Sequence, residues 1–166
     1  MASGDTLIFI DPRDNEWLGA NPATPDTRNN HPLLDFSDTT DEKAVFKCIM
    51  PRNYAGGGIT VYIHYAMTSD VTNKVRWEAA FERVGDGQQD IDSDGFAAAQ
   101  AVNVAAVPAT SGHVDIVAIT FTNGAQMDSV AVGEGFRLQV ERKPSDGAND
   151  TATGDAELWA IEIKET

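Results

Sequence analysis

Residues 59–84 are ITVYIHYAMTSDVTNKVRWEAAFERV, two runs of alternating character joined by a polar turn at 68–74. In the first run every second residue is large and apolar, as one buried face of a β-strand requires: Ile59, Val61, Ile63, Tyr65 and Met67. In the second run Trp77 and Phe81 take the buried positions between charged residues. The pattern predicts an antiparallel hairpin with one face in a core. Because a hairpin alone is marginally stable, a second sheet has to cover Trp77 and Phe81.

Similar short runs recur along the chain, separated by turns rich in Gly, Pro, Asn and Asp. Besides the two runs above, we expect strands at 6–10, 31–36, 42–51, 96–104, 113–122, 136–142 and 156–164. The part at 96–102 is alanine-rich and could also begin a helix. About nine short strands without a long helical period indicate an all-β fold. Long connections between some strands favour a single antiparallel β-sandwich of jelly-roll type over a simple meander.

The length of 166 residues suits one domain that spans 1–166. Residues 11–30 contain three prolines and show no periodicity, so we expect an extended arm or long loop there. Trp17 and Leu18 are the apolar pair within this polar stretch. Two interpretations stay open: the arm lies on a neighbouring subunit, or Trp17 covers one end of its own sandwich.

The chain has 12 basic and 26 acidic residues, a formal net charge of −14 at pH 7. No run of Lys or Arg is present, which argues against binding to nucleic acid. No apolar run approaches the ~18 residues of a membrane span, and the N-terminus resembles no signal peptide. We therefore expect a soluble, acidic protein made in a cytoplasm. The single cysteine, Cys48, excludes an intramolecular disulfide and is expected to be a buried structural thiol.

Residues 90–95, DIDSDG, place carboxylates at alternate positions before a glycine, as at the start of a calcium-binding loop. An EF-hand is excluded because Ala101 stands where a bidentate glutamate is required. A looser Ca²⁺ site formed by Asp90, Asp92 and Asp94 remains one possibility. The other is an acidic turn whose aspartates bond to their own backbone. We expect no other cofactor.

No arrangement of residues in the sequence indicates catalysis. The serines lie mostly in turns, and no GxSxG motif occurs. Glu78 and Glu82 share a strand face and could imitate a glycosidase pair, but the nearby Arg76 and Arg83 favour ordinary ion pairs. The sequence therefore predicts a protein that is not an enzyme.

Several segments of the chain resemble small β-rich bacteriophage virion proteins. They are residues 26–36 (DTRNNHPLLDF), 51–54 (PRNY, followed by glycines) and 153–158 (TGDAEL). Residues 128–138 are similar to the start of a jelly-roll strand, and the arm at 11–30 matches least. The resemblance, over about 26–166, implies a structural virion protein that acts by self-assembly. Such proteins are commonly homotrimers that decorate a capsid or form part of a tail or fibre, in contact with other virion proteins.

The alternative function is that of a carbohydrate-binding or receptor-binding β-sandwich. In that case exposed aromatic side chains stack on sugar rings, and the candidates are Trp17, Tyr54 and Tyr62. If these aromatics lie together on one open face, glycan binding is favoured. If they are sealed between subunits, assembly is favoured.

Overall fold

The computed structural model describes residues 4–69, 73–87, 89–104 and 106–166, so the middle of the predicted turn at 68–74 lies outside the described residues. Within these ranges the chain forms ten strands and two short 3-10 helices. None of its helices has the length and apolar character needed to cross a membrane. In chain order the elements are β1 (Thr6–Ile10), η1 (Pro12–Asp14), β2 (Thr24–Arg28), β3 (His31–Phe36), β4 (Glu42–Ile49), β5 (Ile59–Met67), β6 (Val75–Val84), β7 (Gln100–Val104), β8 (Asp115–Phe121), η2 (Ala125–Met127), β9 (Gly135–Arg142) and β10 (Ala156–Glu165).

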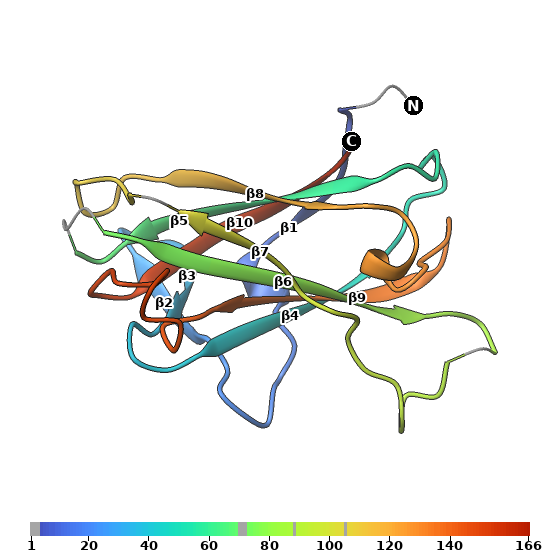
Figure 1. The fold of residues 1–166 in the computed structure, drawn as a ribbon, viewed down its shortest axis with the longest axis horizontal. Helices are drawn as coiled ribbons and strands as arrows, with labels where there is room; N and C mark the ends of the chain where they lie inside the picture. Colours follow the sequence, from blue (N-terminus) through green and yellow to red (C-terminus); the bar gives the residue numbers. More distant parts are fainter. Residues whose placement is uncertain (1–3, 70–72, 88, 105) are drawn as a thin grey trace.

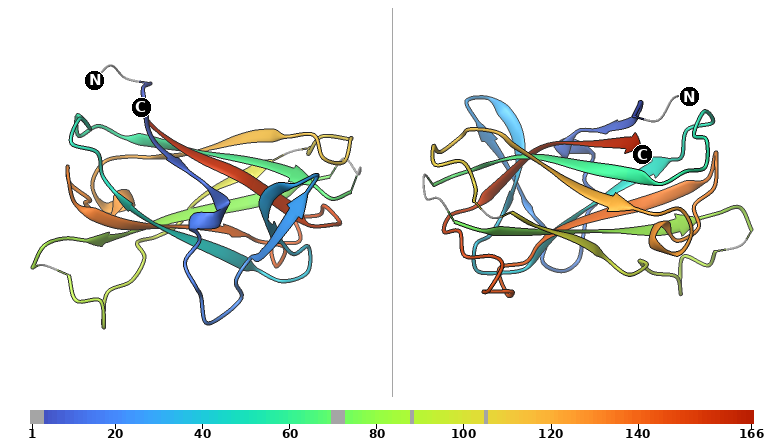
Figure 2. Two further views of the ribbon diagram at one scale, coloured as in Figure 1. Left: turned by 180° about the vertical axis from the view of Figure 1, so that it is seen from behind. Right: turned by 45° about the horizontal axis from the view of Figure 1, so that its top comes forward.

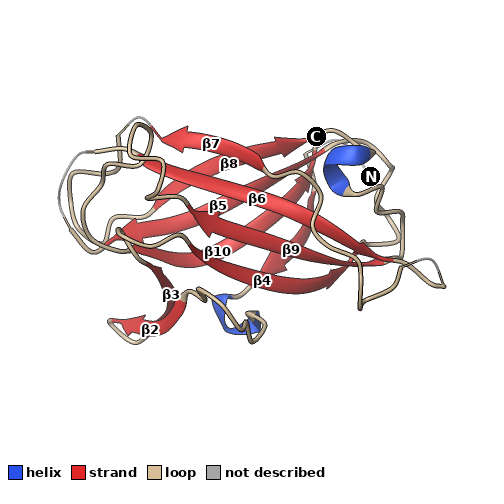
Figure 3. Cartoon of the chain, turned by 60° about the horizontal axis from the view of Figure 1, so that its bottom comes forward, coloured by secondary structure: helices blue, strands red, loops and turns tan. Residues whose placement is uncertain are grey.

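The strands form two antiparallel sheets that lie face to face (Figures 1 and 3). The first sheet has the order β2-β3-β10-β5-β8, and β1 pairs with β10 along the same edge as β3. The second sheet has the order β4-β9-β6-β7. Because β1 and β10 pair antiparallel, the start of β1 lies beside the end of β10 (Figure 2). This arrangement confirms the predicted all-β, antiparallel, jelly-roll-like sandwich.

The predicted hairpin of 59–67 and 75–84 is wrong in its pairing, although both strands exist. β5 pairs with β10 and β8 in the first sheet, whereas β6 pairs with β9 and β7 in the second. The connection at 68–74 is longer than the loops of about two to five residues that close most hairpins. It carries the chain from one sheet to the other. Tyr65 and Trp77 therefore meet across the interior, with ring centroids 5.3 Å apart.

The predicted buried faces of β5 and β6 form the centre of the core. Trp77 and Phe81 are completely buried. Phe36 of the first sheet packs edge-on against Trp77 at 5.0 Å, and Phe121 packs in the same way against Phe81 at 4.9 Å. Such a pair contributes about 0.5–1.5 kcal/mol beyond the area that it buries. Interlocking rings thus hold the two sheets together.

The segment predicted as an irregular arm, 11–30, contains regular structure. Asp11 caps η1 by accepting the Arg13 amide, and Pro12 occupies the first helical position. β2 pairs with β3 through a tight turn at Asn29 and Asn30, whose φ angles are 48° and 63°. Asparagine tolerates this conformation, which tight hairpin turns require. β2 is the strand that the sequence pattern did not predict.

Strand β7 begins later than the predicted start at residue 96. Residues 96–99 have no regular structure, although the Ala97 amide donates to the Phe81 carbonyl at 2.8 Å. Alanine gives a strand little side-chain surface to pack, so pairing with β6 starts only at Gln100.

Cys48 of β4 is half-buried and packs against the core. Burial, together with the charge of Asp14, raises the pKa of its thiol to about 11. The thiol is therefore protonated at neutral pH and weakly nucleophilic, as expected for a structural cysteine.

A buried ion pair organises the loop between β9 and β10. Arg142 is fully buried and donates to both carboxylate oxygens of Asp150, at 3.0 and 3.1 Å. Its other donors bond to the carbonyls of Phe36, Ala152 and Gly154. Since all of the guanidinium's donors have acceptors, this buried charge is fully compensated.

Candidate functional site

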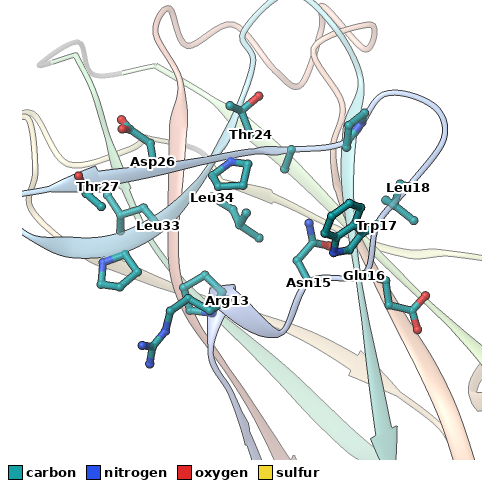
Figure 4. Close-up of a pocket in the computed structure, with 15 residues that line it drawn as sticks. Arg13, Asn15, Glu16, Trp17, Leu18, Thr24, Asp26, Thr27, Leu33 and Leu34 are labelled. Atoms are coloured by element: carbon teal, nitrogen blue, oxygen red, sulfur yellow. The ribbon is translucent and has the colours of Figure 1, made fainter.

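An open groove of about 800 Å³ runs along one edge of the sandwich. One wall consists of η1 and the loop that follows it, residues 15–23. The other wall is the hairpin of β2 and β3 (Figure 4). Apolar side chains, such as Leu18, Pro25 and Leu34, alternate in the lining with polar ones, such as Arg13 and Thr27. A cleft with this mixture of surfaces is typical of a ligand site.

Loop 15–23 is fixed to β4, the edge strand of the second sheet. The Glu16 amide donates to the Val45 carbonyl at 2.7 Å, and the Val45 amide donates to Asn15 Oδ1 at 2.9 Å. At the other end of the loop, Lys43 of β4 makes two more backbone hydrogen bonds, at 2.9 and 3.0 Å. A loop held at both ends presents the residues between them in a defined position, which lowers the entropic cost of binding.

Trp17 stands between these anchors, at the rim of the groove, and its side chain is entirely exposed (102%). Burying a tryptophan removes roughly 150–250 Å² from water, or about 4–6 kcal/mol at ~25 cal/mol per Å². In the folded chain the indole of Trp17 stays in water, so this free energy of burial does not contribute to folding. Figure 4 shows the indole with Leu18 on the loop side of the groove, while Thr24 and Asp26 lie on β2. The ring can offer a flat apolar face to a ligand in the groove.

Charged side chains around the groove are mostly paired within the protein. Asp11 accepts the Arg13 guanidinium through both carboxylate oxygens, at 2.8 Å each, and this hydrogen bonding lowers the pKa of Asp11 to about 2. Glu16 forms an ion pair with Arg137 at 2.7 Å. Its other carboxylate oxygen is buried and has no hydrogen-bond partner among the described residues. Asp26 adds a further exposed carboxyl group, so the charged side chains of the lining, Arg13, Glu16 and Asp26, have a net charge of −1.

A second carboxyl group, Asp35 of β3, lies diagonally across the β2–β3 hairpin from Asp26. Burial, together with the negative charges of Asp26, Glu157 and Asp155, raises the pKa of Asp35 to about 7. The charge of the β2–β3 hairpin therefore changes with pH close to neutrality, although Asp35 itself does not line the groove.

The three aromatic residues predicted to bind ligands lie in different places. Of these, Trp17 lines the groove. Tyr54 is buried, with 4% exposed, and its hydroxyl donates to the Gly57 carbonyl. Tyr62 lies on the outer face of the first sheet, where the Lys164 ammonium is 5.7 Å from its ring centroid. The structure does not gather the three residues on one face.

Asp90, Asp92 and Asp94 lie in an exposed turn, and the side chains of Asp90 and Asp94 accept hydrogen bonds from its backbone. Asp90 Oδ1 accepts the Asp92 amide at 3.0 Å, and Asp94 Oδ2 accepts the Asp90 amide at 3.2 Å. This matches the alternative of an acidic turn that bonds to itself. Throughout the described ranges, no group of three or more His, Cys, Asp or Glu side chains could hold a metal ion. Calcium binding by these aspartates stays an untested prediction.

Strand β2 supplies groove residues that the sequence pattern did not select, among them Thr24, Asp26 and Thr27. These side chains are ordinary polar residues around Pro25, and only the pairing of β2 with β3 brings them to the groove. The turn pair Asn29–Asn30 could have placed this strand, because asparagines are favoured where a hairpin needs positive φ.

Comparison with solved structures finds similar folds in carbohydrate-binding modules. The C-terminal CBM6 of LamC, a marine laminarinase from Zobellia galactanivorans, matches with a TM-score of 0.56 and 11% identity, over 97% of this chain and 100% of that one. The CBM22-1 xylan-binding domain from Paenibacillus barcinonensis matches with a TM-score of 0.52 and 9% identity, over 99% and 97% of the two chains.

A GH115 4-O-methyl-α-glucuronidase with specificity for decorated arabinogalactans contains a similar part, with a TM-score of 0.53 and 9% identity, over 99% of this chain and 18% of the enzyme. No protein-family model and no curated protein sequence matches the chain. At identities this low, the similarity shows a shared fold.

Proposed function

We propose that this protein is a carbohydrate-binding β-sandwich that holds a glycan in the edge groove, with Trp17 stacked on a sugar ring. The observation that carries the proposal is the fully exposed indole of Trp17 on an anchored loop beside an open cleft. Sugar rings have an apolar face of C–H groups that suits an aromatic surface, and their hydroxyls need polar partners at its edge. Thr24, Asp26 and Thr27 are such partners. The fold shared with carbohydrate-binding modules supports the proposal.

The proposed role is binding without catalysis. The carboxylate of Glu16 in the groove is held in an ion pair with Arg137. The acidic residues that could imitate a glycosidase pair, Glu78 and Glu82, form ion pairs with Arg76 and Arg137 at 2.7 and 2.6 Å. Non-catalytic modules in the similar structures agree with this role.

The proposal is tested with the Trp17→Ala variant and a panel of soluble neutral and acidic polysaccharides, by affinity electrophoresis and calorimetry. We expect the unmodified protein to bind at least one glycan, and Trp17→Ala to bind it at least about tenfold more weakly, equivalent to about 1.4 kcal/mol. Trp17→Phe keeps an aromatic ring and should retain part of the affinity. Ile91→Ala, at an exposed apolar side chain outside the groove, is the matched control. Equal binding by Trp17→Ala, or no binding to any glycan, would refute the proposal.

The role that the sequence resemblance implies, a homotrimeric virion component located on a bacteriophage capsid, tail or fibre, stays a prediction. Glycan binding is compatible with it, because a receptor-binding fibre combines virion assembly with recognition of surface glycans. One observation favours glycan binding as the primary function. The groove and the Trp17 indole are formed by a single chain and are open to solvent there.

A further inference from the structure

Exposed apolar side chains gather on the outer face of the first sheet, away from the core. Phe9 of β1 is 63% exposed, Ile116 of β8 is 55% exposed and Trp159 of β10 is 43% exposed. Tyr62 and His64 of β5, both half-buried, lie between them. We call these five residues the outer patch.

Strand register shows that the outer patch is continuous. Phe9 pairs with Glu162, Glu162 with Tyr62, and Tyr62 with Ala118, which forms one row across four strands. In the next row Ala160 pairs with His64, and His64 with Ile116. Side chains in such rows are direct neighbours on one face of a sheet.

Trp159 reaches this face through a β-bulge. Leu158 opposes Tyr65 on the inner face, and Ala160 opposes His64 on the outer face, so Trp159 is an extra residue between them. Its ring lies 6.2 Å from that of His64. A bulge in a central strand disturbs the hydrogen-bond ladder and commonly redirects a side chain for use. Here it adds a large aromatic surface to a face on which Phe9 and Ile116 are also exposed.

The acidic residues Asp26, Asp35 and Glu157 lie on the β2–β3 side of this face. The outer patch itself is balanced in charge, in contrast to the net charge of −14 of the whole chain. Its central charges are Glu162 and Lys164, one of each sign. At its border Glu157 is paired with Arg28. Two strongly acidic molecules repel one another over most of their surfaces. They repel one another less where they approach through the outer patch, which is apolar and has no net charge.

We propose that the outer patch binds a second copy of this chain in a two-fold symmetric dimer. A two-fold interface joins identical patches, so it requires a surface that complements itself. The outer patch meets this condition, because Glu162 and Lys164 of one copy can face their opposites on the other. Aromatic and aliphatic side chains of this kind are typical of the core of protein interfaces.

A glycan fits the outer patch less well than a second copy does. Phe9, Ile116 and the neighbouring Ala118 offer carbon surface without hydrogen-bonding groups, so sugar hydroxyls lying over them would have no partners. The edge groove, by contrast, is lined by both apolar and polar side chains.

The size of the face sets the expected strength of the dimer. Four strands about 4.8 Å apart, over about seven residues of 3.3 Å each, cover roughly 450 Å² per copy. This is at the low end for specific interfaces, so the dimer should dissociate on dilution.

The test is the mass in solution, measured by sedimentation and light scattering over a series of protein concentrations. We expect the weight-average mass to rise from 17.8 kDa toward twice that value as the concentration increases. Ile116→Glu places a like charge on both copies and should weaken association at least tenfold. Trp159→Ala should weaken it as well. Ile91→Glu, an equivalent change at an exposed residue outside the patch, should leave it unchanged.

Circular dichroism and thermal melting of each variant establish that it is folded. A constant mass of one chain, a stable trimer, or unchanged association of Ile116→Glu would overturn the proposal. The proposal would also be overturned if a glycan dissociated the dimer and Trp159→Ala no longer bound that glycan, because the outer patch would then be a glycan site. Glycan binding in the groove is measured separately: Ile116→Glu should retain it, whereas Trp17→Ala should lose it and still dimerise.

Discussion

Folding holds Asp35 as a carboxylic acid close to pH 7, where an exposed aspartate is ionised. Burial is the main cause, and the negative charges of Asp26, Glu157 and Asp155 add to it. A pKa raised from 3.8 to about 7 means that the folded chain keeps this proton while the unfolded chain loses it. Stability therefore falls as the pH rises through this window and stays at its lower level above it.

Replacing Asp35 with asparagine should remove this effect. We expect Asp35→Asn to be more stable than the unmodified protein at pH 8 by roughly 1–2 kcal/mol, a value reduced for solvent screening because Asp35 is partly exposed. At pH 4 the two proteins should unfold alike. Urea unfolding at several pH values measures the difference. Asp26→Asn, which removes only one of the neighbouring charges, should give a smaller change, and identical pH profiles for Asp35→Asn and the unmodified protein would contradict the assignment.

Loop 15–23 lies between the edges of the two sheets. It is bonded to β4 of the second sheet and faces β2 of the first sheet across the groove. Its position depends on Asn15, whose Oδ1 accepts the amide of the buried Val45 at 2.9 Å. An unpaired buried amide costs about 1–3 kcal/mol, so this one hydrogen bond matters for the loop as a whole.

The Asn15→Ala variant should therefore loosen the loop and weaken glycan binding several-fold, although Trp17 is still present. Hydrogen exchange at the Val45 amide reports the loosening, and a glycan titration reports the affinity. Asn15→Asp keeps an acceptor at the same atom and should retain more protection of Val45. Unchanged exchange in Asn15→Ala would show that the loop is held by its other contacts alone.

At the scale of the whole molecule, 26 acidic residues face only 12 basic ones. Ion pairs such as Arg83–Glu134 and Arg137–Glu82 use most of the available cations, so the excess carboxylates repel one another. Salt screens both the attraction within the ion pairs and the repulsion among the carboxylates. The repulsion is the larger of the two because unpaired acidic charges predominate, so salt should stabilise the folded chain.

We therefore expect the free energy of unfolding at pH 7 to rise between about 0.05 and about 0.5 M NaCl, by an amount of the order of 1 kcal/mol. Urea unfolding at the two salt concentrations tests this. Near pH 4.3, the isoelectric point of the sequence, the same change in salt should have little effect. A fall in stability with salt at pH 7 would mean that the ion pairs outweigh the repulsion.

The fold class, most strand positions and the buried faces of β5 and β6 could be predicted from the sequence alone. These properties are local: alternation with a period of two shows which side chains of a strand enter a core, whatever the partner strand is. The same alternation contains no information on which edge of a strand pairs with which neighbour. The partners of β5 and β6 were therefore decided only by the tertiary structure.

The candidate site divides in the same way. Trp17 could be selected from the sequence because a large aromatic residue in a polar segment requires an explanation. Tyr54 and Tyr62 looked equivalent to it, yet one is buried and the other lies on a different face. Exposure depends on what the rest of the chain places over a side chain. The groove itself exists because β2 and the loop on β4, which belong to different sheets, meet at one edge of the sandwich.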